Sequence, residues 1–186
     1  MQKLKIVGGK KLTGEIPISG AKNSAVALIP AAILCDEETN ILNIPEISDR
    51  DDLIEIMTLL GAEINSHSEK MTINSSHVQN REIKEELTTR LRASYYFMGA
   101  LLGRFKHAEI YFPGGCQIGQ RKIDYHLKGF QAMGATITED KMKYIIDASE
   151  LKGAKIYLDF ASVGATINIM LAAVKAKGIT VIKNAA

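Results

Sequence analysis

One segment of this 186-residue sequence, from Pro113 to Arg121, combines the residue types of a catalytic loop. It holds three glycines, and its thiol, Cys116, lies five residues before the guanidinium of Arg121. Glycine lets a backbone approach a ligand closely, and a nearby guanidinium lowers the pKa of a thiol and offers paired donors to a phosphate or carboxylate. The segment therefore suggests an acid or nucleophile beside an anion, although similar glycine-rich turns also occur in plain hairpins.

The composition is that of an ordinary globular protein and excludes several classes of function. Apolar residues make up 46% of the chain and charged residues 24%, and the formal net charge is +2. Lys and Arg are scattered, so the basic surface of a nucleic-acid binder is missing. Two cysteines cannot form a disulfide framework, no Cys/His cluster has zinc-ligand spacing, and no apolar stretch approaches a membrane span. We expect a cytoplasmic protein that binds neither nucleic acid nor membrane.

The elements that must position the loop recur with a period of about seventy residues, which indicates an internal repeat. Each unit has an apolar helix, a strand, an amphipathic helix and two more strands, and we expect units at about 21–88, 89–153 and 154–186, the last incomplete. A capping box at Ser48 should open the first amphipathic helix. The expected helices are 25–35, 48–60, 89–102, 123–133 and 167–176. The expected strands are 3–7, 14–19, 40–43, 62–66, 71–74, 109–112, 136–138, 144–147, 155–159 and 179–183.

The repeat predicts an α/β inside-out barrel. Because every unit contributes one wholly apolar helix, these parallel helices should be buried in the centre with the sheets outside. Under an approximate threefold relation, their N-termini meet on one face, together with Lys22, Asn23, Arg92 and residues 162–164. Helix N-termini reinforced by positive side chains bind anions such as phosphate, so that face is the expected ligand site.

Four motifs follow one another in the sequence: SGAKNS at 19–24, LRAS at 91–94, the loop at 113–121 and SVGAT at 162–166. Together they resemble the UDP-N-acetylglucosamine enolpyruvyl transferases (1-carboxyvinyltransferases) of bacterial cell-wall synthesis, over the whole chain. The resemblance implies an inside-out α/β fold and an activity that needs no metal or organic cofactor. It also implies transfer of the enolpyruvyl group of phosphoenolpyruvate to the 3-hydroxyl of UDP-N-acetylglucosamine, the first committed step of peptidoglycan synthesis, which serves cell shape and cell division.

The resemblance also assigns roles to single residues. Cys116 would be the general acid and could form a covalent adduct, while Lys22 and Arg121 would hold the phosphate of phosphoenolpyruvate. Asn23 and Arg92 would contact the substrates. Two segments would bind the uridine and diphosphate: the first is Arg121, Lys122, Ile123, Asp124 and Tyr125, and the second is Phe160, Ala161, Ser162, Val163 and Gly164.

Two features depart from the family pattern. Lys122 and Tyr125 replace the Pro and the Leu or Gln that the family usually has there, which alters the expected uridine pocket. The family enzyme is also more than twice as long, and its second domain supplies an aspartate base, a further arginine and the partner of strands like those expected in residues 1–20. We therefore expect an N-terminal part that is inactive alone, with an incomplete third unit whose apolar edge is open to self-association.

Two other functions stay open at this point. One is a nucleotide-sugar binding or regulatory module without catalysis, which would bind UDP-N-acetylglucosamine through this domain alone. The other is a relative of the shikimate-pathway enolpyruvyl transferase, against which the Gly-Gly-Cys loop and the Ser162 segment speak. Outside the motifs, we interpret Cys35 as a core residue, and Arg90 and His126 as surface residues.

Overall fold

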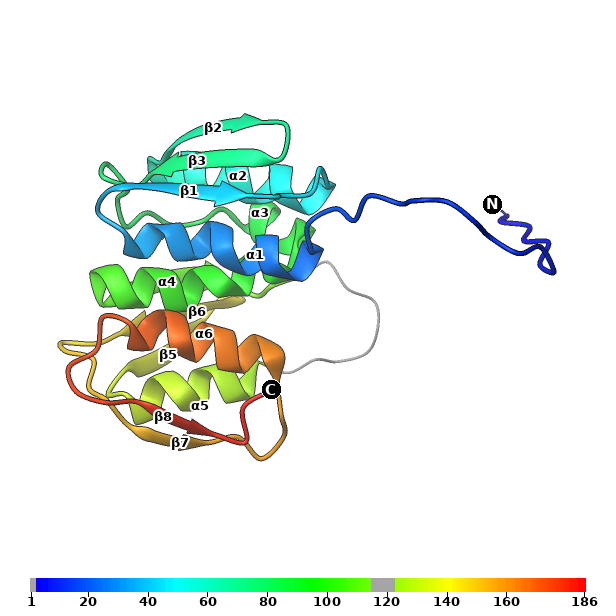
Figure 1. Cartoon of the computed structure of the whole chain (residues 1–186). Helices are drawn as coiled ribbons and strands as arrows, with labels where there is room; N and C mark the ends of the chain where they lie inside the picture. The colour runs from blue at the N-terminus through cyan, green and yellow to red at the C-terminus, as the bar shows by residue number, and fades with distance from the viewer. Residues whose placement is uncertain (1–2, 115–122) are drawn as a thin grey trace.

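Three helices lie side by side in the centre of the molecule, with small sheets on the outside (Figure 1). They are α1 (Lys22–Ala31), α4 (Tyr96–Phe105) and α6 (Val163–Ala173), one from each expected unit. The computed structural model describes residues 3–114 and 123–186. This arrangement confirms the α/β inside-out fold predicted from the apolar helices.

The first two units have the same sheet topology. The first places β1 (Glu38–Leu42), β2 (Glu63–His67) and β3 (Lys70–Asn74) in an antiparallel sheet of order β1-β3-β2, with α2 (Ser48–Leu60) between β1 and β2 in the chain. The second repeats this order as β4-β6-β5. Its elements are α3 (Glu85–Arg90), the 3₁₀ helix η2 (Arg92–Tyr95), β4 (His107–Tyr111), α5 (Asp124–Ala132), β5 (Thr136–Asp140) and β6 (Lys143–Asp147).

The third unit pairs β7 (Lys155–Tyr157) in parallel with β8 (Val181–Lys183). Its sheet therefore has two strands, where each of the others has three. The repeat of elements agrees with the predicted period, while the exact unit boundaries stay a prediction.

The amphipathic helix α2 shows how the sequence pattern builds the core. Its side chains at Leu53, Ile56, Met57 and Leu60 are fully buried, which is the stripe expected from their spacing. Gly61 ends the helix with φ +103°, a left-handed conformation that favours glycine. The predicted capping box is wrong, because Ser48 is the first helical residue and the preceding residue provides no side-chain cap.

Residues 3–20 form no strand, so the two strands predicted there are wrong for this chain. Figure 1 shows this segment as an arm that leads away from the body of the molecule. Its apolar side chains, including Leu4, Ile6 and Ile16, are exposed. A strand needs a partner for its backbone groups, and none of the described sheet edges pairs with the arm.

Several helix boundaries also differ from expectation. Helix α1 begins at Lys22 and passes through Pro30, after which the chain continues as the 3₁₀ helix η1 (Ala32–Leu34). Cys35, just beyond it, is exposed rather than in the core. Helix α3 was not predicted, and the expected helix over 89–102 is divided between α3, η2 and α4.

Helices α4 and α6 approach each other closely at two glycines of α4. A methyl group built on Gly99 would lie 2.3 Å from the backbone oxygen of Asn168, and one on Gly103 would lie 2.9 Å from that of Leu171. Real side chains do not tolerate such contacts, so glycine at these positions is what allows the two backbones to pack together.

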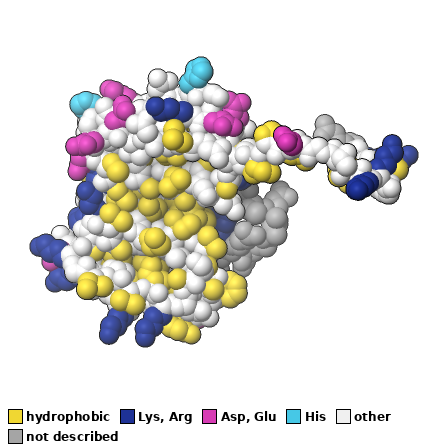
Figure 2. All heavy atoms as spheres, viewed as in Figure 1, with side chains coloured by type: hydrophobic (Ala, Val, Ile, Leu, Met, Phe, Trp, Pro, Cys, Tyr) yellow, Lys and Arg dark blue, Asp and Glu magenta, His cyan; other side chains and the backbone are white. Residues whose placement is uncertain are grey.

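A broad apolar area covers the central helices on the face shown in Figure 2. On these helices, Leu28 of α1 and Met170 of α6 are exposed, and Val174 just beyond α6 is 67% exposed. Self-association through this edge of the third unit stays a prediction. Among the helices of the described residues, none has the length and apolar character needed to cross a lipid bilayer.

Replacing Gly99 with alanine tests the close contact between α4 and α6. Alanine gains up to about 1 kcal/mol over glycine inside a helix, but over-packing a core typically costs about 1–3 kcal/mol. Because the clash is with backbone, we expect G99A to lower the free energy of unfolding by at least about 1 kcal/mol in urea denaturation. Gly8→Ala in the arm, where nothing lies within 4 Å, is the control. Equal stability of the two variants would contradict this packing.

Candidate functional site

A cleft of about 930 Å³ opens where the N-terminal ends of the inner helices meet. It is lined by Lys22 and Asn23 at the start of α1, by Tyr96 at the start of α4, and by Val163 and Gly164 at the start of α6. The first turns of α2 and α5 also contribute. The prediction that these N-termini share one face is confirmed.

Most of the predicted site residues that the structure describes line this cleft. They are Lys22, Asn23, Arg92, Tyr125, Phe160, Ala161, Ser162, Val163 and Gly164. Ile123 is buried just before α5, and neither it nor Asp124, the first residue of α5, lines the cleft. Cys116, Arg121 and Lys122 lie outside the described residues, so their predicted roles stay predictions.

The ammonium group of Lys22 forms an ion pair with Asp49, a residue that the sequence did not point to. Its Nζ lies 2.8 Å from Oδ1 of Asp49, which belongs to the first turn of α2. A lysine at a helix N-terminus opposes the helix dipole, and the carboxylate compensates for this. Lys22 is 56% exposed and Asp49 only 19%, so an anion entering the cleft can reach the ammonium group from the solvent side.

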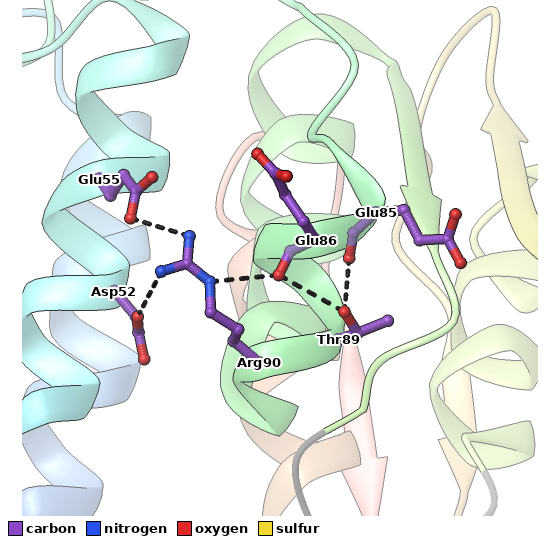
Figure 3. Close-up of polar contacts among 6 residues, drawn as sticks. All are labelled: Asp52, Glu55, Glu85, Glu86, Thr89 and Arg90. Carbon is purple, nitrogen blue, oxygen red and sulfur yellow. Dashed lines mark hydrogen bonds and ion pairs between the residues drawn. The ribbon is translucent and has the colours of Figure 1, made fainter.

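Arg90 joins α3 to α2 at the edge of the cleft (Figure 3). Its Nη2 lies 2.9 Å from Oε2 of Glu55 and its Nη1 lies 3.4 Å from Oδ1 of Asp52, while Nε donates to the backbone oxygen of Glu86. Arg90 is exposed, as predicted for a surface charge, and it also forms these ion pairs. The ion pairs of its guanidinium with Asp52 and Glu55 tie α3, the short helix that precedes Arg92, to α2.

The same helix α3 holds the beginning of the cysteine loop. The backbone oxygen of Thr88 accepts hydrogen bonds of 3.1 Å from the N–H of Gly114 and from the hydroxyl of Ser94. A methyl group on Gly114 would lie 2.2 Å from the backbone oxygen of Thr89. Gly114 is thereby held against α3, whose C-terminal residue leads directly into η2 and Arg92.

The start of α6 offers backbone donors to the cleft. Ser162 is the N-cap of this helix, and its hydroxyl accepts a hydrogen bond from the N–H of Ala165. The first N–H groups of a helix have no intrahelical partner, and within the described residues those of Val163 and Gly164 show none elsewhere. Two amides and the positive end of the helix dipole therefore face the space where an anion would be seated.

His126 is a part of the site that the sequence reasoning missed. It is only 4% exposed, its ring packs against Tyr95 at 4.8 Å between centroids, and its Nδ1 lies 2.9 Å from Nδ2 of Asn168. Burial and, to a lesser degree, the charge of Arg92 lower the pKa of His126 to about 4. The prediction of a surface histidine is wrong. A signal was present, because His126, Phe130 and Met133 have the spacing of a buried helix stripe.

Because residue 164 is a glycine, the rings of Tyr95 and His126 can lie directly against the start of α6. A methyl group there would lie 2.8 Å from the hydroxyl of Tyr95 and 3.3 Å from Cε1 of His126. The guanidinium of Arg92 lies 5.8 Å from the centre of the Tyr95 ring. The rings of Tyr95 and His126 thus lie against the start of α6, and the guanidinium of Arg92 lies near the Tyr95 ring.

Among residues 3–114 and 123–186, no group of three or more His, Cys, Asp or Glu side chains is placed to hold a metal ion. The independence from metal expected from the sequence stays a prediction. The described cleft can bind an anion through lysine, arginine and helix amides.

Comparison with known proteins shows the family to which the chain belongs. The sequence model of a family described as EPSP synthase (3-phosphoshikimate 1-carboxyvinyltransferase) matches residues 6–186. Over the whole chain, UDP-N-acetylglucosamine 1-carboxyvinyltransferase 2 is 54% identical in Oceanobacillus iheyensis and 50% identical in Bacillus subtilis. The chain covers 44% and 43% of these two proteins, so it spans less than half their length.

Solved structures agree on the fold. The enolpyruvyl transferase NikO from Streptomyces tendae superposes with a TM-score of 0.79 at 24% identity, over 94% of this chain and 41% of that protein. EPSP synthase from Acinetobacter baumannii gives a TM-score of 0.70 at 19% identity, over 91% of this chain and 40% of that protein.

The buried His126 should make the protein less stable in acid. In the unfolded chain its pKa returns to 6.5, whereas in the folded protein it is about 4, so the unfolded state binds more protons between these values. Stability that is fully present above pH 6.5 is therefore lost as the pH falls towards 4, by about 3 kcal/mol in total. Urea denaturation across this range measures the slope.

A matched pair of variants isolates this contribution from that of the carboxylates. His126→Phe removes the titrating ring and should flatten the slope between pH 6.5 and 4. His67→Phe, at an exposed position on β2, should leave it as in the wild type. If both variants keep the wild-type slope, His126 is not the group responsible.

Proposed function

Because the chain belongs to the EPSP synthase (3-phosphoshikimate 1-carboxyvinyltransferase) family, we propose that it forms one wall of an enolpyruvyl-transfer site. The donor is phosphoenolpyruvate, the acceptor is the 3-hydroxyl of UDP-N-acetylglucosamine, and phosphate is released. The observation that carries this proposal is that Lys22, Asn23, Arg92 and residues 160–164 line the same cleft.

The choice of acceptor rests on the relatives. Those with 54% and 50% identity over the whole chain carry UDP-N-acetylglucosamine in their names, whereas the EPSP synthase structure is 19% identical. The 3-phosphoshikimate acceptor is therefore the weaker candidate. The reaction would be the first committed step of peptidoglycan synthesis in the cytoplasm, and it would serve cell shape and cell division.

The proposed roles of single residues are those that the family resemblance implies. Lys22, together with Arg121 of the loop, offsets the phosphate of phosphoenolpyruvate, while Asn23 and Arg92 contact the substrates. The amides of Val163 and Gly164 are suited to the diphosphate of the nucleotide sugar. Cys116 is the proposed general acid, whose thiol proton goes to the methylene carbon of phosphoenolpyruvate. The acceptor hydroxyl then adds to C2 and gives its proton to a base from the rest of the relatives' length. The thiolate of Cys116 takes a proton back from the methyl carbon as the bond from C2 to the phosphate oxygen breaks, which restores the double bond and releases phosphate.

We expect enolpyruvyl transfer to need residues in addition to those of this chain. The relatives are more than twice as long, so the described cleft would be one wall of a site whose remaining residues come from the rest of their length. We expect the 186-residue chain to bind UDP-N-acetylglucosamine and to show no turnover on its own. A binding module without catalysis would behave in the same way, and only adding the missing part tells the two apart.

Calorimetry with UDP-N-acetylglucosamine tests the binding part of this proposal. Arg92→Gln should weaken binding roughly ten- to a hundredfold, as expected when a charged hydrogen bond to an anion is lost. Arg81→Gln makes the same change of charge at an exposed position outside the cleft, and it should bind like the wild type. Absence of binding by the wild type, or equal effects of the two variants, would contradict the proposal.

A phosphate-release assay with both substrates tests the catalytic part. The chain alone should release no phosphate, and release should begin when the remaining part of a relative is added as a second polypeptide. Robust release by the chain alone would show that its cleft is complete. No release from the combination would favour a binding module.

A further inference from the structure

We propose that strand β8 is an interaction surface for a second copy of this chain. The two β8 strands pair antiparallel across a twofold axis, which joins the third-unit sheets of both copies into one continuous sheet of order β7-β8-β8-β7. The inference concerns the 186-residue chain and does not depend on the proposed function.

The backbone groups of Ile182, in the middle of β8, point away from β7. The N–H of Val181 donates to the backbone oxygen of Ala154 at 2.8 Å, and the backbone oxygen of Lys183 accepts from the N–H of Leu158 at 3.1 Å. Along a strand, the backbone groups of neighbouring residues point to opposite edges. The N–H and C=O of Ile182 therefore lie on the other edge of β8, where no strand of the described residues pairs.

The repeat shows what kind of strand this edge takes. In the second unit, β4 follows the inner helix α4 as β8 follows α6. Ile110 of β4 pairs in parallel with Ile83 on one side, and β6 pairs antiparallel along the other side. In the first unit, β1 likewise pairs antiparallel with β3. Since β8 has its parallel partner in β7, the free edge corresponds to the one that takes an antiparallel strand in both other units.

A second β8 fits this edge in a single symmetric register. With Ile182 on the twofold axis, its N–H donates to the C=O of the partner subunit's Ile182, and its C=O accepts in return. Val181 then lies directly opposite Lys183 of the partner subunit, so no like charges face each other across the pair. Because such an interface is isologous, one surface on each copy is enough to close a dimer.

The free edge of β8 lacks the charges that protect other sheet edges from association. The outer strand of the second sheet, β5, ends in Glu139 and Asp140, which repel the same edge of another copy. The charged residue of β8 is Lys183, whereas residues 179–182 are Ile, Thr, Val and Ile, which all favour strands. Ile179 is 82% exposed, so pairing can also remove apolar surface from water.

The residues that follow β8 leave this edge open. Asn184 has a φ of +55°, which turns the chain out of the strand. Its side-chain amide donates to the backbone oxygen of Leu158 at 2.7 Å, and the N–H of Ala186 donates to Oγ1 of Thr166 at 3.2 Å. The end of the chain is thus bonded next to β7 and to α6.

The arm at residues 3–20 is the other strand-like segment that could occupy the edge. Its charges disfavour this, because it carries four lysines against one glutamate: Lys3, Lys5, Lys10, Lys11 and Glu15. The edge of β8 carries Lys183, with Lys177 shortly before the strand. An arm strand would add lysines beside these, whereas the symmetric register places Val181 opposite Lys183.

Sedimentation equilibrium of the 186-residue chain tests the association. The average mass should rise from 20.3 kDa at micromolar concentration towards twice that value at millimolar concentration. Ile182→Pro removes the N–H that faces the partner and spares the bonds to β7, so it should weaken the dimer at least about tenfold. Proline at both Ile6 and Ile16 in the arm is the matched control and should leave the dimer unchanged.

Two outcomes of this experiment would overturn the proposal. One is a mass that stays at the monomer value at every concentration. The other is a dimer that survives Ile182→Pro but is lost with the arm prolines, which would assign the edge to the arm.

Disulfide cross-linking tests the register, and it also decides the question should Ile182→Pro fail to fold. In a chain whose Cys35 and Cys116 are replaced by serine, Val181→Cys and Lys183→Cys together should give a covalent dimer on oxidation. Directly opposite residues that are not hydrogen-bonded to each other lie close enough for a disulfide. Either cysteine alone faces no thiol and is the control. Equal cross-linking of the double and single variants would overturn the proposed pairing.

Discussion

The contact between α4 and α6 through Gly99 and Asn168 is the constraint on which the site depends. Without a side chain at Gly99, the two backbones come close enough for the Asn168 amide to accept from one helix and to donate to the residue preceding it. The same amide orients His126 from a third helix. Because one buried group satisfies three partners on different elements, the N-terminal ends that form the cleft are held in a fixed relation.

Acids of α2 pair with two of the cations that line the cleft. Lys22 lies against Asp49, and Arg90 lies against Asp52 and Glu55. An arriving anion therefore meets two cations that are already positioned, so that less side-chain freedom remains to be lost on binding. Asp49 also compensates for the unfavourable position of Lys22 at a helix N-terminus.

The sequence predicted those features that arise from periodic burial and failed where a single partner decides the structure. The stripe ending at Leu60, the repeat and the meeting of helix N-termini follow from apolar spacing alone. Histidine is polar, so the sequence predicts a surface position for His126. Its burial is acceptable because the ring is hydrogen-bonded to the Asn168 amide, forty-two positions away. The arm at residues 3–20 has a strand-like alternation without a partner strand, and Cys35 lies just past the apolar run rather than inside it.

The described cleft is proposed to bind the diphosphate of a nucleotide sugar through the amides at the start of α6. A crystal structure of the chain with UDP-N-acetylglucosamine tests this placement most directly. We expect diphosphate oxygens within hydrogen-bonding distance of the amides of Val163 and Gly164, with the Asn168 amide still bonded to Gly99. A nucleotide sugar bound away from these two amides would contradict the proposed placement.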